Sequence, residues 1–205
     1  MSQSPLVLYV ETNFLLSIAT GRDPDASDIL ADIGSPDRLV LPQVCFMEAF
    51  SVLNGMHRSR NQFRNQLDQQ IGEMSRDSTS AHARELLSLL EQARIASDKL
   101  LEDIDTRLFS TVGRLSRDAE LIGLTGEILE EQRKTILIKE PTDNLILHCI
   151  LAHAREHPAE DKAFLTGDKA FRDPKVQNEL DIVGVTKSFR EGKQFRMWFV
   201  SQPRS

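Results

Sequence analysis

The chain has 205 residues, enough for one domain with a buried core, and carries a formal net charge of -6. A composition of 40% hydrophobic and 27% charged residues is ordinary for a soluble globular protein, and no apolar run is long enough to cross a bilayer. The acidic balance excludes the strongly basic field typical of non-specific nucleic-acid binding, although a local basic stripe can coexist with an acidic metal site.

The N-terminus lacks the basic stretch of a signal peptide, and the two cysteines, Cys45 and Cys149, stand in apolar contexts. A cytoplasmic protein with two buried thiols and no membrane partner is therefore expected.

The first quarter of the chain alternates between strand and helix patterns. Five apolar residues rich in β-formers, Leu6–Val10, predict a buried strand that ends abruptly at Glu11. Gly21, Gly34 and Pro42 supply the breaks between the elements that follow. These elements are expected to be helices over 14–19 and 25–33, a strand over 38–41 and a helix over 44–56.

The middle of the chain, residues 59–131, predicts long helices. It contains no proline, and apolar residues recur there at steps of three and four, as one stripe of a helix does. That stripe comprises Leu86, Leu90, Ala93, Leu100, Ile104, Leu108, Val112 and Leu115. The polar stretch Asp77–Ser80 predicts a break and an N-cap, so we expect two or three helices packed as a hairpin.

The last third predicts a helix from Pro141 to Ala154 and then strands over 163–166, 181–185 and, at an edge, 195–200. Strands that alternate with helices are typical of an α/β fold, here a parallel sheet flanked by helices. We expect one domain over residues 1–205, with a long helical insertion at about 59–131. In such sheets, ligands bind beyond the carboxyl ends of the strands, where the strand order switches.

Four carboxylates fall at or near that edge. Glu11 directly follows the first strand, and Asp168 follows the strand over 163–166 by two residues. Asp143 lies in the first turn of the preceding helix, and Glu48 in the helix after the second strand. Taken singly, Asp143 can complement a helix dipole and Asp168 can be part of a turn. Charges amid apolar residues, as at Glu11 and Glu48, require a partner.

Converging carboxylates repel one another unless a cation lies between them, and burying one alone is costly. Hard divalent cations such as Mg²⁺ and Mn²⁺ take oxygen ligands of this kind. Two such ions about 3.5–4 Å apart can stabilise both the attacking and the leaving oxygen of a phosphodiester. The pattern therefore indicates a metal-dependent hydrolase that acts on phosphodiester bonds.

The stretches around these carboxylates resemble the PIN domain family of metal-dependent nucleases, which includes toxin ribonucleases and RNA-processing enzymes. The matching stretches are Val10-Glu11-Thr12-Asn13, Glu48 in Pro42-Gln-Val-Cys-Phe-Met-Glu, Asp143 in Thr142-Asp-Asn-Leu-Ile-Leu, and Asp168 in Phe164-Leu-Thr-Gly-Asp-Lys-Ala-Phe. The family usually has aspartate at the first position. Glu11 is longer by one methylene, which moves its oxygens outward.

The resemblance implies a PIN-like parallel sheet and an endoribonuclease that uses Mg²⁺ or Mn²⁺ to hydrolyse RNA. Glu11, Glu48, Asp143 and Asp168 would be the metal ligands and the catalytic residues. Thr12 and Asn13 would orient Glu11, and Thr166 would support Asp168 from outside the ligand set.

Basic residues on both sides of this site are candidates for phosphate contacts. Lys169 and Arg172 follow Asp168, and Arg58 and Arg60 follow the helix of Glu48, where a solvated helix face is an equal alternative. The helical middle is suited to an RNA clamp or to a homodimer interface.

Three other interpretations remain open at this level. His153-Ala-Arg-Glu156-His157 matches the pattern of inverted zinc metallopeptidases, but Pro158 disfavours helical geometry at His157, so the exposed end of a helix is expected instead. A PIN-like scaffold without catalysis is compatible with Glu11. The third interpretation is a toxin with an antitoxin-like protein partner, and it requires that a neighbouring gene encode this partner.

Overall fold

The computed structural model describes residues 5–32, 34, 37–77 and 79–202. The chain divides into two compact units. The sheet unit comprises Met1–Ala49 and Leu108–Ser205, and the hairpin unit comprises Phe50–Arg107.

The sheet unit is built on five parallel strands. These are β1 (Leu6–Val10), β2 (Arg38–Pro42), β3 (Glu120–Ile122), β4 (Asp161–Leu165) and β5 (Lys187–Phe189), in the order β3-β2-β1-β4-β5. The chain runs outward from β1 to β3 and begins again with β4 on the other side of β1, so the strand order switches between β1 and β4. Because Val10 is level with Leu165, the residues that follow these two strands emerge next to each other. This is the place where α/β sheets bind ligands.

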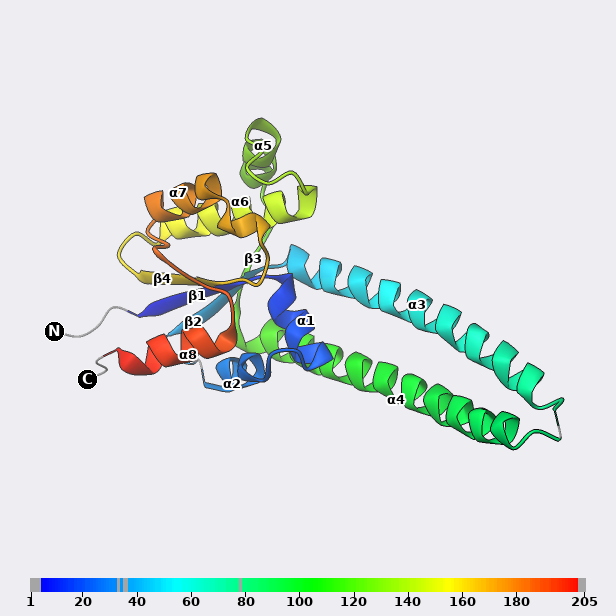
Figure 1. Cartoon of the computed structure of the whole chain (residues 1–205). Coiled ribbons are helices and arrows are strands. Elements are labelled where there is room, and N and C mark those ends of the chain that lie inside the picture. The colour runs from blue at the N-terminus through cyan, green and yellow to red at the C-terminus, as the bar shows by residue number, and fades with distance from the viewer. Residues whose placement is uncertain (1–4, 33, 35–36, 78, 203–205) are drawn as a thin grey trace. The chain divides into compact units, whose positions relative to one another are not determined.

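Helices cover both faces of the sheet (Figure 1). One face carries α1 (Thr12–Thr20), α2 (Pro24–Asp32) and α8 (Gly192–Ser201), and the other carries α5 (Gly126–Lys134), α6 (Pro141–Glu156), α7 (Pro174–Ile182) and the short 3-10 helix η1 (Ala170–Arg172). Every residue of β1 is buried, which explains its unbroken apolar run. The expected α/β fold with a parallel sheet is confirmed.

The hairpin unit consists of residues 50–74 of α3 (Val44–Met74) and residues 81–107 of α4 (Ala81–Asp118). An ion pair and a hydrogen bond join the two helices, with Arg94 Nη1 3.1 Å from Asp68 Oδ1 and His57 Nε2 2.8 Å from Asp105 Oδ1. At the tip, the Asp77 carboxylate accepts hydrogen bonds from the Thr79 and Ser80 amides at 3.0 Å. The expected pair of long helices and the polar break between them are confirmed.

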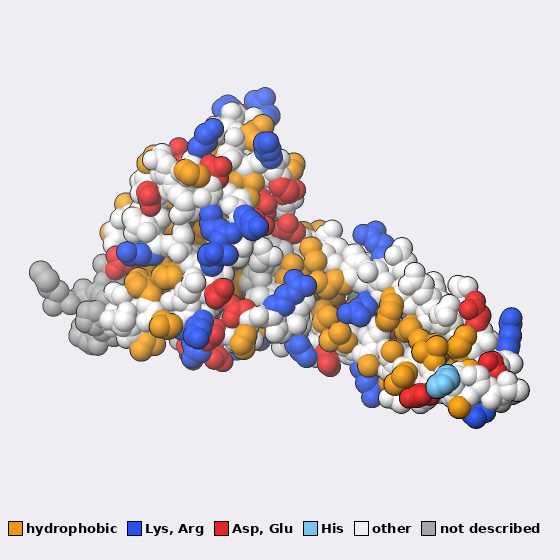
Figure 2. Space-filling model, in the orientation of Figure 1, with side chains coloured by type: hydrophobic (Ala, Val, Ile, Leu, Met, Phe, Trp, Pro, Cys, Tyr) orange, Lys and Arg blue, Asp and Glu red, His pale blue; other side chains and the backbone are white. Residues whose placement is uncertain are grey.

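The outer surface of the hairpin remains partly apolar, as the orange side chains in Figure 2 show. Leu86, Leu89 and Leu100 on α4 are 42%, 56% and 41% exposed. Their spacing of three and then eleven residues keeps these three side chains on one side of the helix. Part of the apolar surface of α4 is therefore left exposed.

Three strand predictions for the second half differ from the structure. β3 was not expected, because its three residues directly follow a 38-residue helix and lie inside the span expected to be an insertion. A strand over 181–185 is wrong, since α7 continues to Ile182 and a turn at Gly184, with φ of 85°, leads to β5. A strand over 195–200 is also wrong. This segment forms α8, where Phe195 stacks on Phe199, four residues later, at 5.2 Å between ring centroids.

Cys45 and Cys149 are free and buried, as expected, and burial raises the pKa of the Cys149 thiol to about 11. Among the described residues, no helix combines the length and the apolar character that a membrane span requires.

Candidate active site

Glu11 lies at the centre of the carboxyl edge of the sheet. It is the N-cap of α1, and its Oε2 accepts a hydrogen bond from the Asn13 amide at 2.6 Å. Its Oε1 accepts one from the Thr166 hydroxyl at 3.0 Å. The residue is only 2% exposed, so these contacts hold the carboxylate in one position inside the protein.

Thr166 connects Glu11 with Asp168. Its hydroxyl oxygen accepts the Asp168 amide at 3.1 Å, while Asp168 Oδ1 accepts the Ala170 amide at 2.7 Å. The loop after β4 is thereby fixed against the end of β1. Support of Asp168 by Thr166 was expected, and the structure adds a direct bond from the same hydroxyl to Glu11.

Glu48 lies near the start of α3 and is joined to the same edge by Thr12, whose hydroxyl donates to Glu48 Oε2. Thr12 was expected to orient Glu11. In the structure, the backbone amide of Asn13 does so, and the Thr12 side chain serves Glu48 instead.

Asp143 approaches from the first turn of α6. Glu140 is the N-cap of this helix and accepts the Asp143 amide at 2.6 Å, which places a fifth carboxylate beside the cluster. Asn144 is 2% exposed and fastens the preceding loop: its Oδ1 accepts the amides of Leu137 and Ile138 at 2.9 and 3.1 Å. Its Nδ2 donates to the Thr135 carbonyl at 3.3 Å.

The carboxylates act on one another electrostatically. Burial raises the pKa of Glu11 to about 7, and the charges of Asp168 and Asp143 add to the shift. Burial likewise raises the pKa of Asp143 to about 6, with further contributions from Asp168, Glu140 and Glu48. All four of the carboxylates expected in the site are thus brought together at one edge.

The residues present suit a hard divalent cation. Neighbouring carboxylates such as Glu11 and Asp143, whose pKa values are raised, are stabilised when a cation takes the place of the protons. The donor set consists of carboxylate oxygens, which Mg²⁺ and Mn²⁺ prefer, and it contains none of the nitrogen or sulfur ligands typical of zinc sites. The fit therefore rests on the chemistry of the donors and on the electrostatic cost of leaving them unneutralised.

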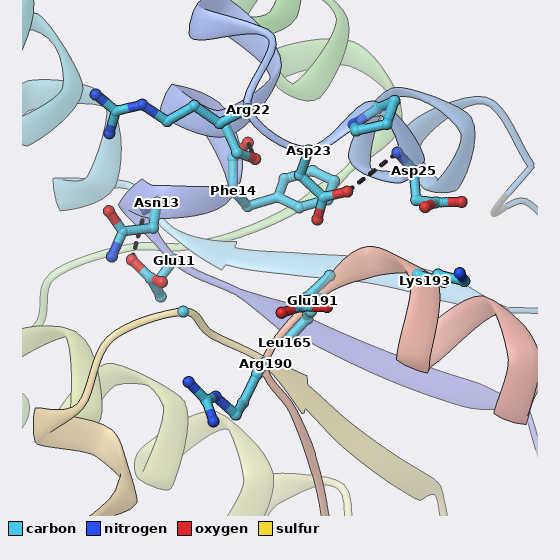
Figure 3. A pocket seen from close by; sticks show the side chains of 13 residues that line it. Glu11, Asn13, Phe14, Arg22, Asp23, Asp25, Leu165, Arg190, Glu191 and Lys193 are labelled. Atoms are coloured by element: carbon cyan, nitrogen blue, oxygen red, sulfur yellow. Dashed lines mark hydrogen bonds between the residues drawn. The ribbon is translucent and has the colours of Figure 1, made fainter.

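A pocket of about 370 Å³ opens beside Glu11 (Figure 3). Arg22, Arg190 and Lys193 line it together with Asn13, and none of these three cations forms an ion pair with a residue in the described ranges. Of the acidic residues in the lining, Asp23 accepts the Gly192 amide at 2.8 Å and Asp25 pairs with Arg196 at 2.9 Å. The pocket thus presents free positive charges next to the carboxylate cluster.

The basic residues expected to bind phosphates lie elsewhere. Lys169 and Arg172 follow Asp168 at η1 and are not part of the pocket lining. Arg58 and Arg60 belong to the hairpin unit, where Arg60 Nη1 contacts Ser97 Oγ at 3.5 Å. Their role as phosphate contacts stays a prediction.

Several residues of the site are not apparent from the sequence pattern. Of the three pocket cations, Arg22 is far in the chain from Arg190 and Lys193, and the packing of α8 on α2 brings the two segments together. Glu140 could have been noticed, because Glu-Pro-Thr-Asp places an acidic N-cap directly before a proline at the first helical position. Asn144 carries no such sign, since its partners lie in a loop without regular structure.

Comparison with known proteins yields one match. A family model described as PIN domain matches residues 8–171, from β1 to η1, and this span contains all four carboxylates. No curated protein and no solved structure matches the chain.

Proposed function

The chain belongs to the PIN domain family, and from this membership we propose that it is a Mg²⁺- or Mn²⁺-dependent endoribonuclease. PIN domains are generally metal-dependent nucleases that act on RNA. The observation that carries the proposal is the buried Glu11, whose pKa is raised to about 7 beside Asp143 and Asp168 at the switch in strand order. Such a group favours a bound cation at neutral pH.

In this proposal Glu11, Glu48, Asp143 and Asp168 hold the metal, and the same four residues form the catalytic site. When bound, the cation would polarise the phosphodiester and lower the pKa of the attacking water. Thr166 keeps the oxygens of Glu11 and the backbone of Asp168 in a fixed relation, and Thr12 does the same for Glu48. Such outer contacts maintain the geometry of the ligands.

The RNA strand is proposed to reach the site through the pocket beside Glu11. Arg22, Arg190 and Lys193 would then contact its phosphates, because they are exposed and carry charges without a partner in the described part of the chain. Lys169, Arg172, Arg58 and Arg60 are further candidates from the sequence.

The test is cleavage of single-stranded RNA by the purified chain with Mn²⁺. We expect cleavage that EDTA abolishes and that Asp143→Asn and Asp168→Asn reduce by at least a hundredfold. The matched control is Asp181→Asn, an exposed aspartate on α7, which should retain full activity. Equal trace cleavage by the parent chain and both site variants, over several RNAs, would refute the proposal.

A catalytically inactive scaffold is the alternative, and Glu11 at the usual aspartate position favours it. A Glu11→Asp variant distinguishes the endoribonuclease from the scaffold. The endoribonuclease proposal expects the parent chain to be active, whereas a scaffold would bind Mn²⁺ without cleaving RNA and gain activity only with the shorter side chain.

We also propose that residues 1–205 form one domain with an insertion at about 59–131. The protein is proposed to be located in the cytoplasm. A homodimer is supported by the exposed leucines of α4, and a shift to monomer in Leu86→Glu/Leu89→Glu, measured by light scattering, would check it. An antitoxin-like partner would be indicated by growth arrest on expression that an adjacent small protein relieves.

A further inference from the structure

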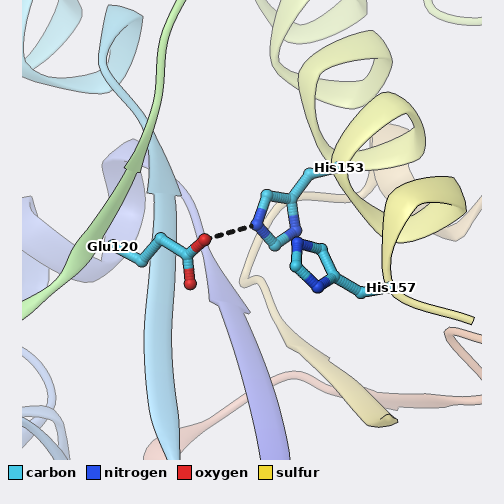
Figure 4. A group of neighbouring side chains, drawn as sticks. All are labelled: Glu120, His153 and His157. Atoms are coloured by element: carbon cyan, nitrogen blue, oxygen red, sulfur yellow. Dashed lines mark hydrogen bonds and ion pairs between the residues drawn. The ribbon is translucent and has the colours of Figure 1, made fainter. Parts of the chain in front are cut away.

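A second group of metal-ligating side chains lies where the start of β3 meets the end of α6. Glu120 begins β3, His153 lies in the last turn of α6, and His157 is the C-cap of that helix (Figure 4). One ligand atom from each of the three lies within 4.8 Å of the others. None of these residues takes part in the site described above.

His153 is held in one orientation. It is 8% exposed, and its Nε2 is 2.9 Å from Glu120 Oε1 while its Nδ1 is 2.8 Å from the hydroxyl of the buried Tyr9. Metal-binding histidines commonly hydrogen-bond through the nitrogen that does not face the ion, and this contact sets their tautomer. Tyr9 provides that contact here, because a hydroxyl can accept a hydrogen bond from Nδ1–H as well as donate one to Nδ1.

His157 is stacked on His153, with ring centroids 4.3 Å apart and an interplanar angle of 29°. Its backbone angles, φ −119° and ψ 57°, take it out of the helix immediately before Pro158. Pro158 therefore does not separate the His157 imidazole from that of His153. The His157 imidazole lies on the face of the His153 ring, with a nitrogen within 4.8 Å of the Glu120 carboxylate.

The Glu120 carboxylate is positioned by Arg38. The guanidinium contacts Glu120 Oε2 on one side and Glu160 on the other, which leaves Glu120 Oε1 facing His153. The two carboxylates and Arg38 together carry one net negative charge. This net negative charge favours binding of a divalent cation, and Arg38 reduces the repulsion between the two carboxylates.

We propose that Glu120, His153 and His157 form a Zn²⁺ site, separate from the carboxylate site. Two imidazoles and one carboxylate are a common zinc donor set, and water would complete a tetrahedron. Tetrahedral ligands at zinc distances are about 3.3 Å apart, so the Glu120 and His153 atoms are already near their positions. Only the half-exposed His157 side chain has to move closer. As Nε2 binds the ion, the neutral ring carries its proton on Nδ1 and donates a hydrogen bond from there to the Tyr9 hydroxyl, so this ring releases no net proton.

The site differs from the pattern visible in the sequence. Glu156, the acidic residue of His153-Ala-Arg-Glu-His157, is exposed and contributes no ligand, while Glu120 supplies the carboxylate from a strand 33 residues away from His153. A pocket of about 490 Å³ is lined by His153 together with Ala152 and Leu121, so solvent reaches this side of His153. A bound ion would link the start of β3 to the end of α6, so its predicted role is structural.

The experiment uses the full chain carrying Asp143→Asn and Asp168→Asn, so that the carboxylate site does not compete, stripped of metal with EDTA. Zn²⁺ is titrated by calorimetry and Co²⁺ by visible absorption, which is intense for tetrahedral sites. We expect one ion per chain and a rise in Tm with Zn²⁺. His157→Ala should weaken binding at least a hundredfold, and His157→Cys should retain it, because a thiolate is also a zinc ligand.

Two control variants mark the site. Glu156→Gln removes the acid of the sequence pattern, and His82→Ala removes an exposed imidazole of the hairpin, so both should bind as the parent does. Equal affinity in the parent and His157→Ala, or loss of binding only in Glu156→Gln, overturns the proposal. RNA cleavage plays no part in these measurements, so failure of the nuclease proposal and failure of the zinc site are distinguishable.

Discussion

Glu11 shows how a single position determines the chemistry of the carboxyl edge. Its oxygens receive hydrogen bonds from Asn13 and Thr166, which favour the charged form, yet burial outweighs them and raises its pKa to about 7. An aspartate here would hold its carboxylate one methylene closer to the backbone. The longer side chain of Glu11 brings its two oxygens to contacts with the start of α1 and with Thr166, directly after β4.

Asp143 should make the metal-free protein less stable at neutral pH. Its pKa is raised in the folded state from 3.8 to about 6, so the folded protein holds the proton more tightly and stability falls as pH rises through that window. Asp143→Asn removes the penalty and should raise Tm in EDTA by roughly 2–4 °C at pH 7.5, or about 1 kcal/mol after solvent screening. At pH 4 the gain should vanish, because the parent carboxyl is protonated.

Thermal unfolding in EDTA at both pH values measures this effect, with Asp181→Asn as the exposed control that should shift neither Tm. A loss of stability in Asp143→Asn at pH 7.5 would contradict the prediction. With Mn²⁺ present the order should reverse, since the parent gains from binding and the variant does not.

Thr166 is predicted to be a positioning residue. Thr166→Val keeps the shape but removes the hydroxyl that donates to Glu11 and accepts from the Asp168 amide. Mn²⁺ affinity should fall about tenfold and the pKa of Glu11 should rise further, moving the pH profile of cleavage upward. Thr166→Ser should restore both, whereas a purely structural role would leave the pH profile of Thr166→Val where it is in the parent.

At the scale of elements, α6 serves both edges of the sheet. Its first turn brings Asp143 to the carboxyl edge, and its last turn brings His153 to Tyr9 and Glu120, because the helix lies across one face of a parallel sheet. The start of the helix is set by Asn144 and Glu140, and its end by Pro158. A change at one end of α6 therefore acts on one site and spares the other.

Asn144→Ala tests this separation. The substitution leaves the amides of Leu137 and Ile138 without their acceptor and should cost about 2–4 kcal/mol of unfolding free energy. Mn²⁺ affinity should fall with it, because the loop that holds Glu140 and Asp143 loses its anchor, while Zn²⁺ binding at His153 should persist. Calorimetry and urea unfolding measure both effects, and Asn178→Ala, exposed on α7, is the matched control. Loss of both metals together would argue against separate ends.

For the whole molecule, charge is the property that bears on RNA binding. The net charge of -6 repels a polyanion at long range, so attraction has to come from local cations such as those lining the pocket. Weak binding with a shallow salt dependence is the expected consequence, in contrast to proteins with many phosphate contacts.

Arg190→Ala/Lys193→Ala should reduce the slope of log affinity against log salt by about two, in Asp143→Asn protein that binds RNA without cutting it. Fluorescence anisotropy over a range of salt concentrations gives the slope. Lys169→Ala/Arg172→Ala removes the same charge from the other side of Asp168 and should leave the slope nearly unchanged. The opposite result would place the RNA along η1.

Local sequence by itself determined the features that depend only on residues close together in the chain. The apolar run of β1, the prolines and the repeated apolar stripe of the hairpin are such features. The four carboxylates were predictable because residues after parallel strands emerge at one edge of a sheet. The short strand β3 and the helix α8 were not, since a three-residue strand depends on its neighbour and aromatic residues suit both periods.

Only the tertiary structure decided which residues from distant segments of the chain contact one another. It brought Arg22, Arg190 and Lys193 to one pocket, joined Thr12 to Glu48, and placed Glu120 beside two histidines that the sequence paired with Glu156. A side chain's partners at long sequence separation follow from how helices pack on the sheet, and no local pattern encodes that packing. Glu11 itself shows both origins: its place after β1 is local, and its raised pKa comes from the burial and the carboxylates that the fold assembles around it.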